Sequence, residues 1–527
     1  MVAVFNNEFV GWFLITLKLR EAVGSAVAGA PMLEFPENHE DEETRSPDFE
    51  WVISIKNQIE QAGQEDEAGS WSKSAICRVP HYLREVDDKA YVPQIISLGP
   101  YHHGEKHLRK MDKHKWRCLH HVMQRPNQDI KLYLDTAREM EAKARSCYEG
   151  PINLSSNEFV EMMVIDGCFV LELFRGVAEG FEELGYLRND PVFSIRGSMD
   201  FIQIDMIMLE NQLPLFVLDR FLRLQLNNSY QKGLLAQLAL IFFYYLTPTP
   251  MKKSERPRLQ ISSGIAASFD PLSVLGPRLE ISSGIAASFD PLLVLGDLHC
   301  LDVYRKSLLR PGPKPRSVQG GLHVFRKSLL RLRPKRRSVQ GDHQSIPCVT
   351  KLREAGIKFR KRKTDRFWDV KYKKGILRVP TLLIDDGTKS LFLNLIALEQ
   401  CHTDRGNEIT SFVVFMDNLI NSPEDVAYLH YCGIIDHGLG SDADVADLFN
   451  QLCQQVVFNI NDSYLSQLFK DVNRYYNNKW HTWQASLKHK YFSNPWAIIS
   501  LFAAVVLLLL TFTQTFFAVY SYYRPRS

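Results

Sequence analysis

The side chains best suited to chemistry gather around residues 100–104, which read PYHHG. His102 and His103 are adjacent there, and four more histidines follow at positions 107, 114, 120 and 121. Imidazole nitrogens bind metal ions and carry protons in catalysis. Adjacent side chains on an extended chain point to opposite faces, however, and no cysteine or carboxylate completes a familiar metal spacing. We therefore expect a structured turn with polar histidine contacts and no metal.

A possible nucleophile is Cys168, which follows Asp166 by two residues. A reactive thiol needs a nearby base and an electropositive surrounding. The neighbours of Cys168 are Ile165, Phe169 and Val170, so the sequence predicts a buried and inert cysteine.

Asp205 and Glu210 stand five residues apart, on different faces of a predicted helix, and this spacing suits buried polar contacts better than joint acid–base catalysis. The chain contains no GxSxG, HExxH, Walker A or GxGxxG motif. We identify no catalytic, cofactor-binding or metal-binding residue and expect a protein that is not an enzyme. The alternative is an uncharacterised enzyme that uses the His102/His103 region or Cys168.

The elements that must position these residues are mostly helices, because apolar residues recur at spacings of three and four. Helices are predicted at 106–124, 129–147, 157–178, 200–224 and 232–246. Short strands are expected at 75–79 and 92–98, and a hairpin at 369–384 with its turn at residues 373–375. The predicted fold class is mainly α with small β-hairpins, a helical globular body followed by one C-terminal transmembrane helix.

Composition divides the 527 residues into five parts. These are an acidic, poorly ordered tail (1–47), a helical region with the PYHHG motif (48–250), a duplicated basic loop (251–343), a second helical region with the hairpin, packed against the first (344–490), and a membrane anchor with a short tail (491–527). Within the loop, residues 257–276 and 277–296 are identical at eighteen of twenty positions, and residues 303–320 resemble 324–341. A surface loop tolerates such lengthening best.

Charge and cysteine usage limit the partners. The net charge of +3 is small, and the twelve Lys and Arg residues between Asp302 and Asp342 are accompanied by few aromatic residues. We expect no nucleic-acid partner; this basic run is a solvated loop, an import signal or a surface against anionic lipid. Nine scattered cysteines without a CxxC pair favour a reduced, cytosolic setting.

Residues 491–523 contain no charged side chain. The stretch that begins with Trp496 and ends with Tyr520 would reach about 37 Å as a helix, enough to cross a hydrocarbon core. Aromatic residues at both ends match the membrane interfaces. The sequence predicts a single-pass helix in contact with membrane lipid; the alternative is a central helix of a large core, with Gln514 as its polar residue.

The side of the membrane follows from the flanking charges. Four Lys and Arg residues precede the helix, at positions 474, 479, 488 and 490, and two follow it, at 524 and 526. The positive-inside rule therefore places the large body in the cytosol. The glycosylation sequons at Asn153, Asn227 and Asn461 are then expected to be unmodified.

Eight segments of the chain together resemble a plant family known as domain of unknown function 247. They are residues 77–104, 111–116, 163–174, 205–221, 346–359, 375–388, 392–401 and 494–500. The resemblance implies a mostly helical body with one C-terminal membrane helix, and it carries no catalytic residues. Some grass members are linked to self-incompatibility, so the resemblance suggests a recognition role with an unknown protein partner.

Replacing Leu507 or Leu508 by Arg is predicted to impair membrane insertion, because a charge at the helix centre costs about 2.5–3.5 kcal/mol. Extraction of membranes with carbonate measures this. Unchanged carbonate-resistant retention of both variants would count against the membrane anchor.

Overall fold

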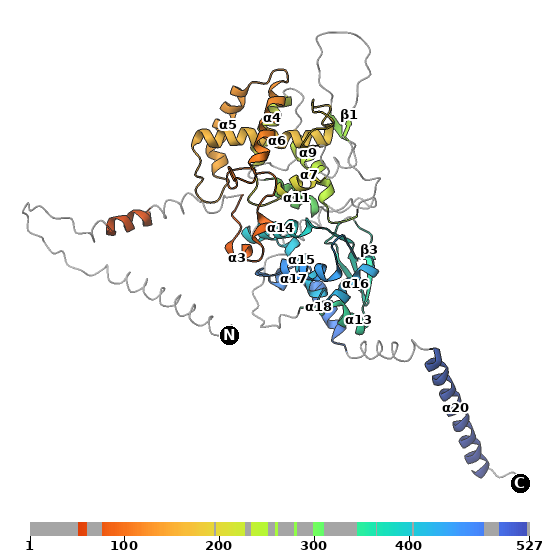
Figure 1. Cartoon of the computed structure of the whole chain (residues 1–527). Coiled ribbons are helices and arrows are strands. Elements are labelled where there is room, and N and C mark those ends of the chain that lie inside the picture. Colours follow the sequence, from red (N-terminus) through yellow and green to blue (C-terminus); the bar gives the residue numbers. More distant parts are fainter. Residues whose placement is uncertain are drawn as a thin grey trace, which may run out of the picture. The chain divides into compact units, whose positions relative to one another are not determined.

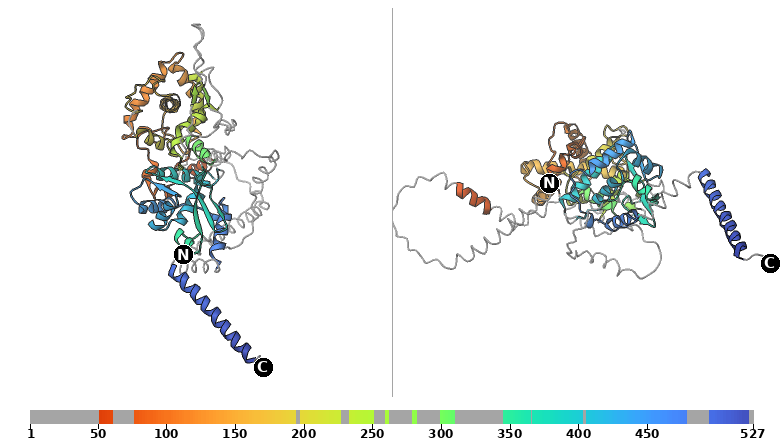
Figure 2. Two further views of the ribbon diagram at one scale, coloured as in Figure 1. Left: turned by 90° about the vertical axis from the view of Figure 1, so that its right-hand side faces the viewer. Right: turned by 90° about the horizontal axis from the view of Figure 1, so that it is seen from below.

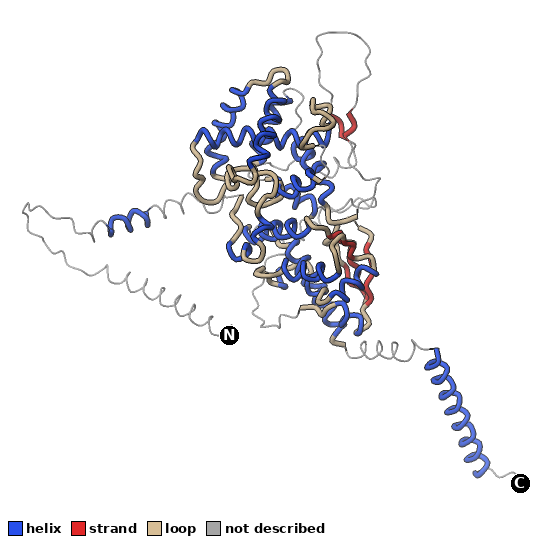
Figure 3. Tube along the Cα trace, in the orientation of Figure 1, coloured by secondary structure: helices blue, strands red, loops and turns tan. Residues whose placement is uncertain are grey.

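The computed structural model describes residues 51–60, 76–193, 197–226, 233–250, 259–261, 279–281, 299–309, 345–364, 366–402, 405–478 and 495–523 (Figure 1). The chain divides into two compact units, Met1–Gly69 and Ser70–Ser527. The described part of the first unit is a helix at residues 51–60. Helix prevails in the second unit, and strands occur in small patches (Figure 3). The expected mainly helical fold is thus confirmed.

The N-terminal part of the second unit surrounds one long helix, α6 (Ser156–Glu179), which is buried from Phe159 to Gly176 except at Glu161. A capping box at its start joins Ser155 and Glu158. The other elements of this part are α3 (His81–Arg84), η2 (Asp88–Tyr91), α4 (Arg109–Met123), α5 (Ile130–Arg145), α7 (Ser198–Asp205), α8 (Leu215–Leu226), α9 (Leu234–Phe242) and η4 (Phe243–Leu246). Helices α4, α5, α8 and α9 pack around α6.

The C-terminal part combines helices with small sheets. Its helices are α11 (Cys300–Leu308), α13 (Val349–Glu354), α14 (Thr388–Cys401), α15 (Glu408–Leu419), α16 (Pro423–Tyr431), α17 (Asp442–Leu452), η7 (Ile460–Asp462) and α18 (Ser466–Tyr476). Figure 2 shows α4–α9 at one end of the body and α14–α18 at the other. Asn394 of α14 links the two, because it accepts from the Leu209 amide (2.9 Å) and donates to the Ala90 carbonyl (2.9 Å).

Three small sheets are described. Strand β5 (Ile376–Pro380) lies between β3 (Lys358–Arg362), to which it is parallel, and β4 (Lys371–Lys373), to which it is antiparallel. Strands β6 (Leu382–Ile384) and β7 (Ile435–His437) pair in parallel, and β1 (Leu259–Ile261) pairs with β2 (Leu279–Ile281) antiparallel. A hairpin forms within the predicted range 369–384, from β4 and β5, and both Lys374 and Gly375 have positive φ, as a tight two-residue turn requires. The end of that range, β6, pairs instead with β7.

Three expected elements differ in the structure. The single helix predicted at 200–224 is two helices, because the chain leaves α7 after Asp205 and re-enters a helix at Leu215, beside Pro214. The strand expected at 75–79 is an isolated bridge between Ile76 and Tyr148. No strand forms at 92–98, where side chains replace a neighbouring strand as hydrogen-bond partners.

Helix α11 falls within the range expected to be a loop, residues 251–343. It is a core element: Leu301, Val303 and Tyr304 are buried, and the Tyr304 hydroxyl donates to the Leu246 carbonyl (2.6 Å). Arg305 forms an ion pair with Glu399 of α14. Apart from α11 with its two flanking residues, and the strands β1 and β2, that range lies outside the described residues.

Residues 94–99 enter the core in neither helix nor strand: Gln94 is exposed, Ile95 is half-buried and residues 96–99 are buried. Buried side chains satisfy the backbone of this segment. Asp205 accepts from the amides of residues 94, 95 and 96 at 2.7–2.9 Å. Asn211 accepts from the Leu98 amide (2.6 Å) and donates to the Ile96 carbonyl (2.9 Å). Unpaired buried peptide groups are costly, so these side chains make the path possible.

Helix α20 (Pro495–Tyr523) contains a stretch, Ile499–Tyr520, that is long and apolar enough to cross a membrane, with a mean hydropathy of 2.2. The hydroxyls of Thr511, Thr513 and Thr515 each donate to the backbone carbonyl four residues earlier, at 2.6–2.8 Å. These bonds lower the cost of placing threonine in an apolar medium.

A pair of glycine variants tests the tight path at residue 99. Gly99 and Gly104 both have positive φ (+72° and +80°), but a Cβ at Gly99 would overlap the Gln212 carbonyl oxygen, whereas a Cβ at Gly104 has no heavy atom within 4 Å. We expect Gly104→Ala to lower the free energy of unfolding by about 1 kcal/mol, through backbone strain alone. Gly99→Ala is expected to cost roughly 2–4 kcal/mol, because the overlap adds to that strain. Urea unfolding of the full chain in detergent, followed by tryptophan fluorescence, measures both; equal losses would contradict the packing described for residue 99.

Candidate functional site

The structure places His102 and His103 in different environments. The side chain of His102 is buried: its Nδ1 lies 2.7 Å from Glu105 and its Nε2 lies 3.8 Å from Glu210. Glu210 also accepts from the Val79 amide (2.7 Å) and pairs with Arg84. His103 is exposed. The PYHHG turn is therefore tied to the core through one histidine, and the two imidazoles do not share a site.

Cys168 and Asp166 lie in the buried centre of α6. Cys168 has no exposed surface, and burial raises the pKa of its thiol well above the usual range. Asp166 accepts from the Lys115 ammonium (2.7 Å) and the Gly99 amide (3.0 Å). Its carboxylate is therefore used in hydrogen bonds that stabilise the fold. No hydrogen bond or ion pair joins Cys168 to His102 or His103 in the described parts of the chain.

Asp205 and Glu210 form the buried polar contacts predicted for them, with separate segments of backbone: Asp205 with residues 94–96 and Glu210 with Val79. Burial raises the pKa of Asp205 to about 6, and hydrogen bonds from three backbone amides oppose that rise. Neither carboxylate reaches the other through a described hydrogen bond. The structure therefore does not bring the residues considered for catalysis into one cleft.

A different feature stands out on the sheet of β3, β5 and β4, which carries cations on one face. In the strand register, Arg378 of β5 lies between Arg360 of β3 and Lys371 of β4. The next row of this face places Ile376 between Lys358 and Lys373. Partners in register point to the same side of a sheet, so these side chains share one face. We call this set the basic sheet face; it comprises Lys358, Arg360, Arg362, Lys371, Lys373 and Arg378.

These cations are mostly unpaired. Arg362 forms an ion pair with Asp369 at 2.6 Å. Across the described residues, the side chains of the other five members of the basic sheet face have no ion-pair or hydrogen-bond partner. Like charges directly opposite one another destabilise a sheet. A row of three cations across adjacent strands is therefore an arrangement that an anionic ligand would relieve.

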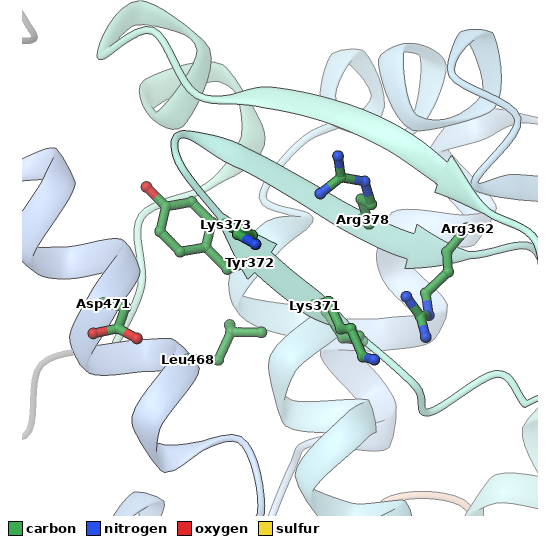
Figure 4. Close-up of a pocket in the computed structure, with 8 residues that line it drawn as sticks. Arg362, Lys371, Tyr372, Lys373, Arg378, Leu468 and Asp471 are labelled. Carbon is green, nitrogen blue, oxygen red and sulfur yellow. The ribbon is translucent and has the colours of Figure 1, made fainter. Parts of the chain in front are cut away.

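One end of the basic sheet face opens into a pocket of about 460 Å³. Arg362, Lys371, Lys373 and Arg378 line it, and α18 supplies Leu468 and Asp471 (Figure 4). The carboxylate of Asp471 already accepts from Gln467 (3.0 Å) and lies 3.7 Å from Arg474. The pocket has the size of a small-molecule site and an excess of positive charge. Its chemistry suits phosphate or carboxylate groups.

The aromatic wall of the pocket is Tyr372, the residue between the two lysines of β4. Burial raises the pKa of its phenol to about 12, and the nearby Tyr475 of α18 adds to the rise. Tyr372 and Tyr475 meet edge to face, with ring centroids 6.3 Å apart. This contact fixes α18 beside β4, so the pocket is shaped by packing and not by a loop.

Three possible metal ligands meet elsewhere: His430 of α16, His437 of β7 and Asp442 of α17 lie with their ligand atoms within 4.8 Å of one another. The His437 Nε2 and Asp442 Oδ1 atoms are 2.9 Å apart and so hydrogen-bond each other. His430 is exposed. A histidine–aspartate contact at the start of α17 accounts for this arrangement without an ion.

The basic sheet face was missed in the sequence, although its signal is visible there. Lys358, Arg360 and Arg362 alternate at the strand period of two, and Lys371 and Lys373 repeat the pattern. The prediction made from charge concerned the basic run between Asp302 and Asp342, most of which lies outside the described residues. The parallel pairing of β3 with β5, which assembles the three-cation row, is a long-range contact that periodicity does not encode.

Comparison with known proteins gives a family and no activity. Residues 76–510 match the family described as a plant protein of unknown function, domain of unknown function 247. The UPF0481 protein At3g47200 of Arabidopsis thaliana is 32% identical over 477 residues, which cover 88% of each chain. The putative UPF0481 protein At3g02645 of the same plant is 24% identical over 534 residues, covering 93% of this chain and 98% of its own. No solved structure matches the chain.

Proposed function

The chain belongs to the plant domain of unknown function 247 family, and we propose that it is a membrane-anchored interaction protein without catalytic activity. We further propose that its basic sheet face binds phosphate groups of anionic lipid headgroups. The observation that carries this proposal is the unpaired row of Arg360, Arg378 and Lys371 beside an open pocket.

The environments of the residues considered for catalysis support a protein without catalytic activity. Cys168 is buried in the core, Nδ1 of His102 is hydrogen-bonded to Glu105, and Asp205 accepts from backbone amides. Each of these groups has a structural task that a catalytic role would disturb. The names of the two Arabidopsis relatives do not assign an enzymatic activity.

Lipid is favoured as the source of phosphate because the chain tethers the pocket to the membrane helix. Helix α18, which forms one wall, ends at Tyr476, and α20 begins at Pro495. The intervening residues 477–494 reach at most about 60 Å when fully extended. A tether of this length presents headgroups at high effective concentration, so a modest affinity per headgroup is enough.

Such binding gives the protein two contacts with one membrane: α20 in the hydrocarbon core and the basic sheet face at the surface. Each cation close to an anionic surface contributes about 1 kcal/mol. The body is then held at the membrane, where it can meet a protein partner. This placement agrees with the recognition role suggested by the family members linked to self-incompatibility, and a protein partner remains part of the proposal.

Labelling of lysines tests the lipid contact. The full chain is placed in nanodiscs of neutral lipid, with or without a phosphoinositide, and treated with an amine-reactive ester before peptide mass spectrometry. We expect Lys371 and Lys373 to be labelled several-fold more slowly with phosphoinositide, while exposed Lys131 on α5 is unchanged. Arg360→Gln with Arg378→Gln should weaken this protection by roughly 2 kcal/mol, or about 30-fold in affinity.

The matched control replaces two exposed cations of another surface, Lys110→Gln with Lys131→Gln, and should leave the protection intact. Equal labelling in both nanodiscs would refute lipid binding at this face. Protection by soluble inositol phosphates in neutral nanodiscs, with none from the phosphoinositide, would move the ligand from lipid to a free phosphate. Protection by an acidic protein alone would replace the lipid by a protein partner.

We also propose that the body lies on the cytosolic side, where the anionic leaflet is found. Two of the three sequons are informative, because Asn153 and Asn461 are exposed, while Asn227 lies outside the described residues. The native protein should show no mobility shift after glycosidase treatment. A shift would place the body in the lumen or outside the cell and would refute the cytosolic assignment. It would not affect the nanodisc result, so the two proposals can fail independently.

A further inference from the structure

Two cysteines that are far apart in the sequence lie close together beside a histidine. Cys77 follows the bridge residue Ile76, and Cys401 is the last residue of α14. The Cys77 sulfur lies 3.3 Å from Nε2 of His402, the residue after Cys401, and the Cys401 thiol is close enough to lower the pKa of Cys77. The Cys401 sulfur also lies 3.8 Å from the Arg78 carbonyl oxygen. These contacts do not depend on the basic sheet face or on α20.

Backbone pairing holds Cys77 in place. The Ile76 amide donates to the Cys147 carbonyl (2.9 Å), and the Glu149 amide donates to the Ile76 carbonyl (3.1 Å). The Arg78 amide donates to the Glu149 carboxylate (2.8 Å). Cys401 is fixed by α14, whose inner face is buried from Leu391 to Glu399. The two sulfurs are therefore brought together by the folded body and not by a mobile loop.

The surroundings give the two thiols different roles. The hydrogen bond from Cys401 and the contact with His402 lower the pKa of Cys77 to about 5, although burial and Glu149 oppose this. The pKa of Cys401 is raised, because its proton is shared with Cys77 and because it is partly buried. Its place at a helix C-terminus also disfavours a negative charge. Cys77 is the thiolate of the pair and Cys401 is the proton donor.

Four other cysteines of the body lack this character. Burial raises the pKa of both Cys118 and Cys300 to about 12. Burial also raises the pKa of Cys168 and Cys453. Cys77 itself is buried, with 8% of its surface exposed, whereas its neighbours Cys401 and His402 are half-buried. Oxidation is selective for thiolates that the oxidant can reach, so an oxidant as small as hydrogen peroxide is the one expected to act on this pair.

We propose that Cys77 and Cys401 form a redox modification site that takes hydrogen peroxide as its oxidant. The Cys77 thiolate attacks one peroxide oxygen, the O–O bond breaks, and Cys77 sulfenic acid and hydroxide result. The Cys401 sulfur then attacks the sulfenic sulfur, a disulfide forms, and the sulfenic oxygen leaves as water with the Cys401 proton. Two thiols and one peroxide thus give one disulfide and two waters, once the hydroxide takes up the proton that Cys77 had lost.

The consequence of oxidation is a covalent link between the start of the body and the end of α14. Reduction by a dithiol restores the two thiols. In a reducing compartment the pair stays open, which is compatible with a cytosolic body.

The first measurement uses the reduced full chain in neutral nanodiscs. An unperturbed thiol reacts with iodoacetamide about 100-fold more slowly at pH 6 than at pH 8, because the thiolate fraction falls tenfold per unit below the pKa. Cys77 is expected to react at nearly the same rate at both values, as judged by peptide mass spectrometry. A fall close to 100-fold for Cys77 would overturn its role as the thiolate.

The second measurement exposes the same sample to a small excess of hydrogen peroxide. We expect a peptide joined through Cys77 and Cys401 that disappears with dithiothreitol. In Cys401→Ser, a dimedone adduct should accumulate on Cys77, and in Cys77→Ser neither product should form. The control Cys348→Ser, at a half-buried cysteine elsewhere, should form the disulfide normally.

The proposal fails if Cys77 and Cys401 stay reduced while other cysteines oxidise, or if Cys77 pairs with a third cysteine. If a serine variant does not fold, His402→Gln provides a second test, because it retains both sulfurs. It is expected to slow disulfide formation at least several-fold. An unchanged rate in folded His402→Gln would remove His402 from the site.

Discussion

The fold depends on the satisfaction of one buried stretch of irregular backbone. Residues 94–99 enter the core, with residues 96–99 buried, where a helix or strand would normally be required, and Asp205, Asn211 and Asp166 supply the hydrogen-bond partners. Lys115 neutralises Asp166 and donates to the Ser97 carbonyl, so α4 and α6 are joined to the same segment. Because a carboxylate can accept from several amides at once, Asp205 accepts the hydrogen bonds that the carbonyls of a neighbouring strand would otherwise accept. Replacement of any of these groups would leave buried peptides unpaired.

This constraint explains why polar residues with catalytic potential occur in apolar surroundings. Asp205 and Glu210 frame a turn whose side chains bind backbone at residues 79 and 94–96. The same logic accounts for Asp166 beside Cys168. Side chains of this kind resemble an active site in the sequence, but in the structure their hydrogen-bonding capacity is used inside the protein.

Local signals in the sequence predicted much of the fold, and distant contacts account for the rest. The long helices, the hairpin turn at Lys374 and Gly375, and the apolar α20 follow from periodicity, turn chemistry and hydropathy. The break between α7 and α8 did not, because it is stabilised by partners that come from far along the chain. The three-cation row and the proximity of Cys77 and Cys401 likewise arise from tertiary contacts, which local sequence patterns do not predict.

Helix α11 has a rival within its own chain. Its sequence VYRKSLL, residues 303–309, returns as VFRKSLL at residues 324–330. The core accepts one occupant at this place, and two contacts distinguish the candidates: the Tyr304 hydroxyl reaches the Leu246 carbonyl, and Asp302 pairs with Arg405, whereas the second copy offers Phe325 and His323 at these positions. Similarity along the chain therefore does not make the two copies equivalent, because the second copy lacks the phenol hydroxyl and the carboxylate that form these contacts.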